Sequence, residues 1–178
     1  SVQGSTCKVI VTGGYTYVSA DGDGIDSNGS VEVSGGTLIV EGPTSSNDGF
    51  FDYDSTATIS GGTVLMVGSA GMAQSFSEGT QAFAMAQASG SAGQNVALLN
   101  ASGSEVASFT ATKNFQMVLA SAAGAAEGDT LTVQIDDAAT SLSASTTAAN
   151  TGRGGMNAAG VGGAGRGGTD APAGAGGA

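Results

Sequence analysis

Hydrophobic and polar positions repeat along the first part of the chain. Each repeat consists of an alternating strand, a Gly-Gly pair and a second apolar strand. The three copies are residues 8–18 (KVIVTGGYTYV), 31–40 (VEVSGGTLIV) and 57–67 (ATISGGTVLMV). Successive Gly pairs are 22 and 26 residues apart, which is the length of one coil of a β-solenoid. The pattern predicts an all-β fold that begins with a right-handed parallel β-helix of about three coils, over residues 1–78.

The alternation also predicts which side chains face the inside of these coils. Every second residue of a strand lies on the same face, so the apolar positions of each copy belong together. We expect the core of the coils to contain Val9, Val11, Val18, Ile25, Val33, Leu38, Val40, Ile59, Val64 and Met66.

The pattern changes after residue 78. Short alternating strands separated by turn residues are predicted at 80–88, 95–99, 105–110, 115–121 and 130–135. We expect the last four to form a small antiparallel unit, within residues 79–136, that caps the coils, since an uncovered terminal coil exposes core and strand edges. Residues 137–178 are rich in Ala, Ser, Thr and Gly and read as a low-complexity tail.

Acidic clusters precede the second and third Gly pairs at matching positions. Asp26 and Asp52 each lie nine residues before a Gly pair, and Asn28 and Asp54 each lie seven before it. Stacked coils would align these oxygen ligands in a column suited to Ca²⁺, which takes six to eight oxygens. The expected metal ligands are Asp23, Asp26, Asn28, Asn47, Asp48, Asp52 and Asp54. The competing interpretation is that Asp, Asn and Gly simply make turns here.

Charge narrows the possible functions. Against 4 Lys and Arg the chain has 15 Asp and Glu, a net charge of −11, which argues against nucleic acid and anionic membranes as partners. No apolar stretch is long enough to span a membrane, and no leader pattern is present. His is absent and there is one Cys, so hydrolase triads are excluded and we expect no enzymatic activity. The composition is typical of a secreted or cell-surface bacterial protein.

A family resemblance covers part of this region. The stretch DGDGIDSNGSVEVSGGTLIVEGPTSSNDGFFDYDSTATISGGTVLMVGSAGMAQ resembles the secreted bacterial carbohydrate-binding domains that have a right-handed parallel β-helix similar to polysaccharide lyases. The resemblance implies calcium and a cellulosic or acidic polysaccharide as ligands. The chain departs from the family's Asp-Asp-Gly unit, because Gly22 and Asn47 stand where the first Asp is usual.

Two functions follow from these observations. The first is an extracellular, calcium-stabilised β-helix that binds polysaccharide without cleaving it, with Tyr15, Tyr17 and Tyr53 as candidate sugar platforms. The second is a structural subunit that assembles into an extracellular fibre or sheath by head-to-tail stacking. The apolar strand at 8–11 favours the second, because no coil precedes it in the repeat and Lys8 is its single guard charge.

Overall fold

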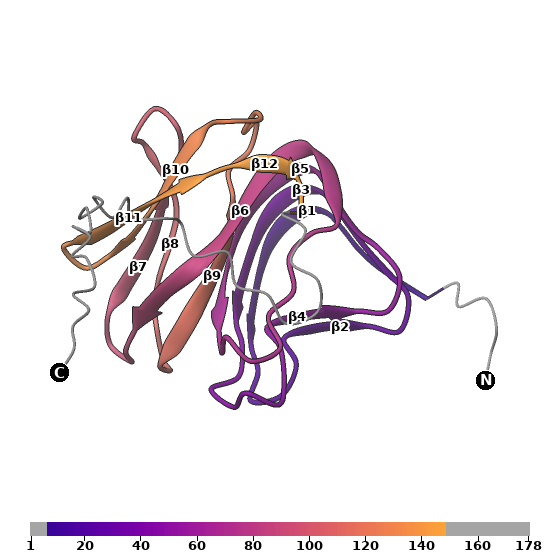
Figure 1. Cartoon of the computed structure of the whole chain (residues 1–178), viewed down its shortest axis with the longest axis horizontal. Helices are drawn as coiled ribbons and strands as arrows, with labels where there is room; N and C mark the ends of the chain where they lie inside the picture. Colours follow the sequence, from indigo (N-terminus) through magenta and orange to yellow (C-terminus); the bar gives the residue numbers. More distant parts are fainter. Residues whose placement is uncertain (1–6, 149–178) are drawn as a thin grey trace, which may run out of the picture.

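The computed structural model of the chain describes residues 7–148, and all regular structure in this range is β (Figure 1). Twelve strands form a six-stranded, a four-stranded and a two-stranded sheet, with no helix among the described residues. The all-β prediction is therefore confirmed. Within residues 7–148 there is accordingly no helical segment that could cross a membrane.

The three sequence repeats lie side by side as parallel strands. β1 (Lys8–Ser19), β3 (Ser30–Glu41) and β5 (Ala57–Gly68) pair in register, so that Val9 lies beside Val31 and Val31 beside Ala57. Their connections contain two short strands, β2 (Ile25–Ser27) and β4 (Phe51–Tyr53), which also pair in parallel. Figure 1 shows the two sets of strands as separate walls of one stack.

The sequence suggested that each Gly pair separates two strands, but the structure shows no such break. Each repeat is one continuous 12-residue strand, and the pairing register shifts at its Gly pair. A bulge of this kind bends a strand without ending it. The expected strand pairs are therefore single curved strands, as β1, β3 and β5 appear in Figure 1.

Close backbone contact explains why these positions are glycine. A Cβ on Gly35 would lie 2.5 Å from the carbonyl oxygen of Thr12, and a Cβ on Gly61 would lie 2.5 Å from that of Ser34. The second glycine of the pair has a left-handed backbone, with φ +84° at Gly36, which disfavours other residues. The repeats can therefore stack at this spacing only with glycine at the bulge.

A hydrophobic core fills the space between the two walls. All ten residues expected there from the alternation belong to this cluster. Six of them are buried. The other four, Val9, Val11 and Val18 of β1 and Ile25 of β2, are half-buried because they lie at the start of the stack.

The third repeat is covered along its far edge. β6 (Glu78–Gly90) pairs in parallel with the first half of β5, at Thr58 and Ile59. β9 (Phe115–Ser121) pairs in antiparallel fashion with the second half, from Val64 to Gly68. The six-stranded sheet has the order β1-β3-β5-β9-β6-β12, with β12 (Ser145–Thr147) beside β6.

The remaining strands form an antiparallel sheet. Its order is β11 (Ala138–Ser143), β10 (Thr130–Ile135), β7 (Asn95–Leu99) and β8 (Glu105–Thr110). A second core lies between this sheet and the six-stranded one, and Leu65 and Val67 of β5 contribute to it. The second half of β5 is therefore buried on both faces.

Two expectations for the second half of the chain are corrected. The strand bounds predicted at 95–99, 105–110, 115–121 and 130–135 are confirmed, but β9 lies in the six-stranded sheet and not with the other three. Residues 138–147, assigned to the tail, form β11 and β12, because Leu142 is buried and small polar residues alternate around it. The rest of the expected tail, residues 149–178, lies outside the described residues.

Candidate functional site

The acidic clusters align as the sequence indicated. Asp26 and Asp52 are direct partners in the pairing of β2 with β4. The backbone N–H of Asp54 donates to the carbonyl of Ser27 at 3.0 Å, which places Asp54 beside Asn28. The matched offsets from the Gly pairs thus correspond to neighbouring positions in space.

Two of these carboxylates already have protein partners. Asp23 accepts a hydrogen bond from the backbone N–H of Gly49 at 2.8 Å, and Asp52 accepts one from the side-chain amide of Gln74. Both bonds link one turn of the chain to the next, so these groups help to hold the stack. Asn28, Asn47 and Asp54 are exposed, whereas Asp48 is half-buried.

No metal centre is assembled in this part of the molecule. Within residues 7–148, no group of three or more His, Cys, Asp or Glu side chains is arranged to hold a metal ion. The column offers carboxylates in pairs, such as Asp26 and Asp52, whereas Ca²⁺ takes six to eight oxygens. Calcium binding therefore stays a prediction.

The aromatic residues divide into two groups. Phe50, Phe51 and Phe76 are fully buried in the core. Tyr53 packs against Phe51, with ring centroids 5.4 Å apart, and its hydroxyl donates to the carbonyl of Ser75 at 2.7 Å. Tyr53 is therefore a structural residue in this fold.

Tyr15 and Tyr17 remain available at the surface. Their side chains lie on the outer side of β1, where Tyr15 is 66% and Tyr17 42% exposed; Ile10, earlier in the same strand, is 56% exposed. Tyr17 also makes an edge contact with Phe109 of β8, at a centroid distance of 6.2 Å. Tyr15 is thus the more accessible of the two rings.

One end of the parallel stack is open. β1 is the first strand of the six-stranded sheet, and no strand within residues 7–148 pairs with its outer edge. Val9, Val11, Val18 and Ile25 lie at this end, half-buried against the core. We refer to β1 and Ile25 as the open end. The opposite end is closed by β6 and β9, which contribute Phe83, Met117 and Leu119 to the same core.

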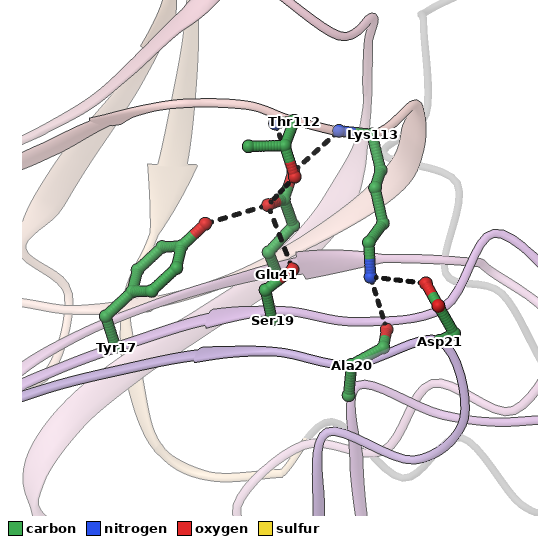
Figure 2. Close-up of polar contacts among 7 residues, drawn as sticks. All are labelled: Tyr17, Ser19, Ala20, Asp21, Glu41, Thr112 and Lys113. Carbon is green, nitrogen blue, oxygen red and sulfur yellow. Dashed lines mark hydrogen bonds and ion pairs between the residues drawn. The ribbon is translucent and has the colours of Figure 1, made fainter.

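A buried carboxylate joins the stack to the second half of the chain (Figure 2). Glu41, at the end of β3, is 1% exposed. It accepts hydrogen bonds from the hydroxyls of Tyr17 (2.9 Å) and Thr112 (2.6 Å). It also accepts hydrogen bonds from the backbone N–H groups of Thr112 and Lys113, in the loop between β8 and β9. Every buried oxygen of this group is thereby satisfied.

Lys113 adds a second link from the same loop. Its ammonium donates to the carbonyl of Ala20 at 2.7 Å and pairs with the carboxylate of Asp21 at 2.9 Å (Figure 2). Asp21 is almost fully exposed, so the ion pair contributes little beyond the backbone hydrogen bond. Together with Glu41, Lys113 fixes the loop on the turn after β1.

The Glu41 contacts have a clear electrostatic signature. Burial acts to raise the pKa of Glu41, but hydrogen bonds from Thr112, Tyr17 and the backbone N–H of Lys113 outweigh it and hold that pKa below its ordinary value. Burial, with the nearby Glu41 charge, raises the pKa of Tyr17. The fold thus favours ionised Glu41 beside a protonated Tyr17.

Sequence reasoning missed this cluster. Glu41 ends the apolar run TLIVE, where a charged residue reads as the polar end of a strand. Its partners Thr112 and Lys113 lie 71 and 72 residues away in the sequence. The single available signal was a lone Glu directly after an apolar strand.

Comparison with known proteins does not assign this chain to a family. The chain matches no protein family model, no curated protein and no solved structure. The site must therefore be interpreted from its own geometry.

We expect Glu41→Gln to destabilise the protein by roughly 2 kcal/mol at pH 7, because a Gln amide cannot accept all of these charge-assisted hydrogen bonds. Denaturant unfolding measures the loss. Glu32→Gln is the matched control, since Glu32 forms a surface ion pair with Lys8, which contributes at most about 1 kcal/mol.

The destabilisation caused by Glu41→Gln should depend on pH. A lowered folded-state pKa means that the stabilisation is complete above the ordinary Glu pKa of about 4.3 and is lost as the pH falls through the folded value. The difference between wild type and Glu41→Gln should therefore narrow in acid. A difference that is constant from pH 7 to acid would contradict the ionised state of Glu41.

Proposed function

We propose that this chain is a non-catalytic structural module that closes one end of a β-helical assembly. In this proposal the first half is a right-handed parallel β-helix of three coils, and the second half is its cap. The observation that carries it is the contrast between the ends of the stack. β6 and β9 cover the third repeat, whereas within residues 7–148 no strand pairs with the outer edge of β1.

A strand with an unpaired outer edge favours association with another strand. The backbone N–H and C=O groups of its outer edge are a template for another strand, and soluble proteins often protect such edges with charged side chains or proline. β1 carries one charged side chain, Lys8, which is engaged by Glu32 of β3. The half-buried valines beside it would gain further burial when another strand adds.

The closed end limits what kind of assembly is supported. Head-to-tail stacking into a fibre needs two open ends, because each copy must both offer and accept a strand. Residues 7–148 offer one such end. The geometry therefore favours a capped stack over the fibre expected from the sequence. Clustered acids and the low content of Lys and Arg support an extracellular location, as the composition indicated.

We expect the purified chain to form dimers through its open ends as concentration rises, and to stop at dimers. Val11→Lys should abolish this, because a charge at the open end blocks strand addition while its long stem still reaches solvent. Ser60→Lys, on exposed Ser60 of β5, is the control that should dimerise normally. Light scattering after size exclusion measures the molar mass. A wild-type chain that stays monomeric up to millimolar concentration would overturn the proposal.

Polysaccharide binding is a second candidate function, favoured by the exposed Tyr15 and Tyr17 pair. Rings at i and i+2 of a strand share one face, and flat aromatic surfaces suit sugar rings. The ligand in this case is a cellulosic or acidic polysaccharide that the protein does not cleave.

We expect Tyr15→Ala to weaken retardation in gels containing carboxymethylcellulose or polygalacturonate by roughly threefold to tenfold. Ile10→Ala is the control, since Ile10 is exposed on the same side of β1. Wild-type protein that migrates freely in both gels would exclude this candidate. Release of an ultraviolet-absorbing unsaturated product would contradict the non-catalytic assignment.

Calcium is proposed as a ligand of the acidic column, with the aligned Asp26 and Asp52 as its support. An ion that binds the folded state raises the melting temperature by mass action, equivalent to about 2.7 kcal/mol at 100 times the dissociation constant. We expect Asp52→Ala to reduce this rise more than Asp21→Ala does, because Asp21 pairs with Lys113 outside the column. Equal melting temperatures in calcium and in a chelator would exclude the ion.

A further inference from the structure

The Gly pairs carry information about what completes the open end. In the second and third repeats the first glycine of each pair is required by the strand before it. The carbonyl oxygen of Thr12 lies 2.5 Å from the position of a Cβ on Gly35, and the carbonyl oxygen of Ser34 lies 2.5 Å from that of a Cβ on Gly61. Atoms at this distance would clash, so each of these two positions accepts glycine alone.

In the first repeat, no such contact requires the first glycine of the pair. A Cβ on Gly13 would meet no described atom within 4 Å, and Gly13 does not have a left-handed backbone. Gly14 has φ +78°, which accounts for that glycine alone. Nothing within residues 7–148 therefore explains why position 13 is glycine.

The missing contact has a defined direction. In both later repeats the crowding atoms belong to the preceding strand. The equivalent contact for Gly13 would come from a strand on the outer edge of β1, parallel to it and with its own bulge in register. Within residues 7–148, no strand pairs with that edge.

We propose that the open end is completed by a parallel strand of the same type, with an alternating segment, a Gly-Gly bulge and an apolar segment, that lies outside residues 7–148. The bulge carbonyl of that strand rests against Gly13 as the carbonyl of Thr12 rests against Gly35. This inference rests on the proposed function and names the partner of the same surface.

A second copy of this chain does not supply such a strand. Its β3 is paired on both edges, its β5 is covered by β6 and β9, and its β1 offers the same outer edge. Two identical edges related by a twofold axis, with their cores on the same side, meet in antiparallel fashion. Dimers of the chain therefore pair this edge in antiparallel fashion and do not supply the parallel, in-register strand.

The apolar residues of the open end support the parallel register. Val9 and Val11 lie before the bulge and Val18 after it, in line with Val31, Val33 and Val40 of β3. A strand of the same type in register would place apolar residues beside all three half-buried valines. The core cluster would then continue into the added strand as it continues from β1 to β3.

A synthetic peptide with the sequence of β3, SVEVSGGTLIVE, is the probe for this strand. We expect a fluorescently labelled, end-capped form to bind the full chain, with binding measured by anisotropy. A nitroxide at the peptide's N-terminus should broaden the amide signals of residues 8–11 and spare those of 17–19, because the strands run parallel. Broadening at 17–19 instead would show antiparallel addition and overturn the inference.

Gly13→Ala is the decisive variant. An added methyl at this position would meet the bulge carbonyl of the docked peptide, so affinity should fall roughly tenfold or more. The fold itself should keep its melting temperature, since the methyl meets no described atom. Gly22→Ala, which also meets open space but lies outside β1, should bind the peptide as wild type does.

The outcomes separate this inference from the proposed function. Peptide binding that Gly13→Ala abolishes, together with dimers that Val11→Lys disrupts, supports both. Dimers that Val11→Lys disrupts, together with no peptide binding or with equal binding by Gly13→Ala, would overturn the parallel strand but leave the capping module. Absence of both dimers and peptide binding would overturn the two together.

Discussion

The close contact between a carbonyl oxygen of one repeat and the glycine of the next sets the geometry on which the rest of the fold depends. Thr12 and Gly35, and then Ser34 and Gly61, approach to a distance that no side chain could occupy. This contact holds three bulges in one column and therefore aligns every strand in register. A slip by one residue would move the core valines to the outer face. The inner core, the acidic column and the shape of the open end all follow from this alignment.

Closure of the stack depends on a different kind of interaction. β6 and β9 each pair with one half of β5, and their apolar residues reach into the inner core while β5 also faces the second core. Glu41 then ties the loop at 112–113 to the end of β3 with hydrogen bonds to a buried charge. Removing one partner of such a group leaves a charge unsatisfied, so the cluster holds the two halves in one arrangement. The stack is consequently covered at its closed end, whereas no strand within residues 7–148 pairs with the outer edge of β1.

This asymmetry is the reason to interpret the molecule as a capping module. β6 and β9 cover one end of the stack, and the other end is formed by β1 within residues 7–148. The acidic residues that suggested calcium are placed where they also link successive turns, as Asp23 does with Gly49 and Asp52 with Gln74. The exposed Tyr15 lies on the outer side of β1, so a sugar ligand and an added strand would use different faces of the same element.

The sequence by itself determined the repeats and the ten core positions, because alternation and glycine spacing are local signals that survive in any stacked arrangement. It also placed Asp26 beside Asp52, since equal offsets from a Gly pair become equal heights in a stack. Three features were decided by the tertiary structure alone. β9 joined the six-stranded sheet because the edge of β5 offered hydrogen bonds that its own sequence could not specify. β11 and β12 formed from a segment of low-complexity composition because neighbouring strand edges and the burial of Leu142 stabilise them. Glu41 gained its partners across 71 residues, and a contact between such distant positions depends on how the sheets pack, which no local pattern records.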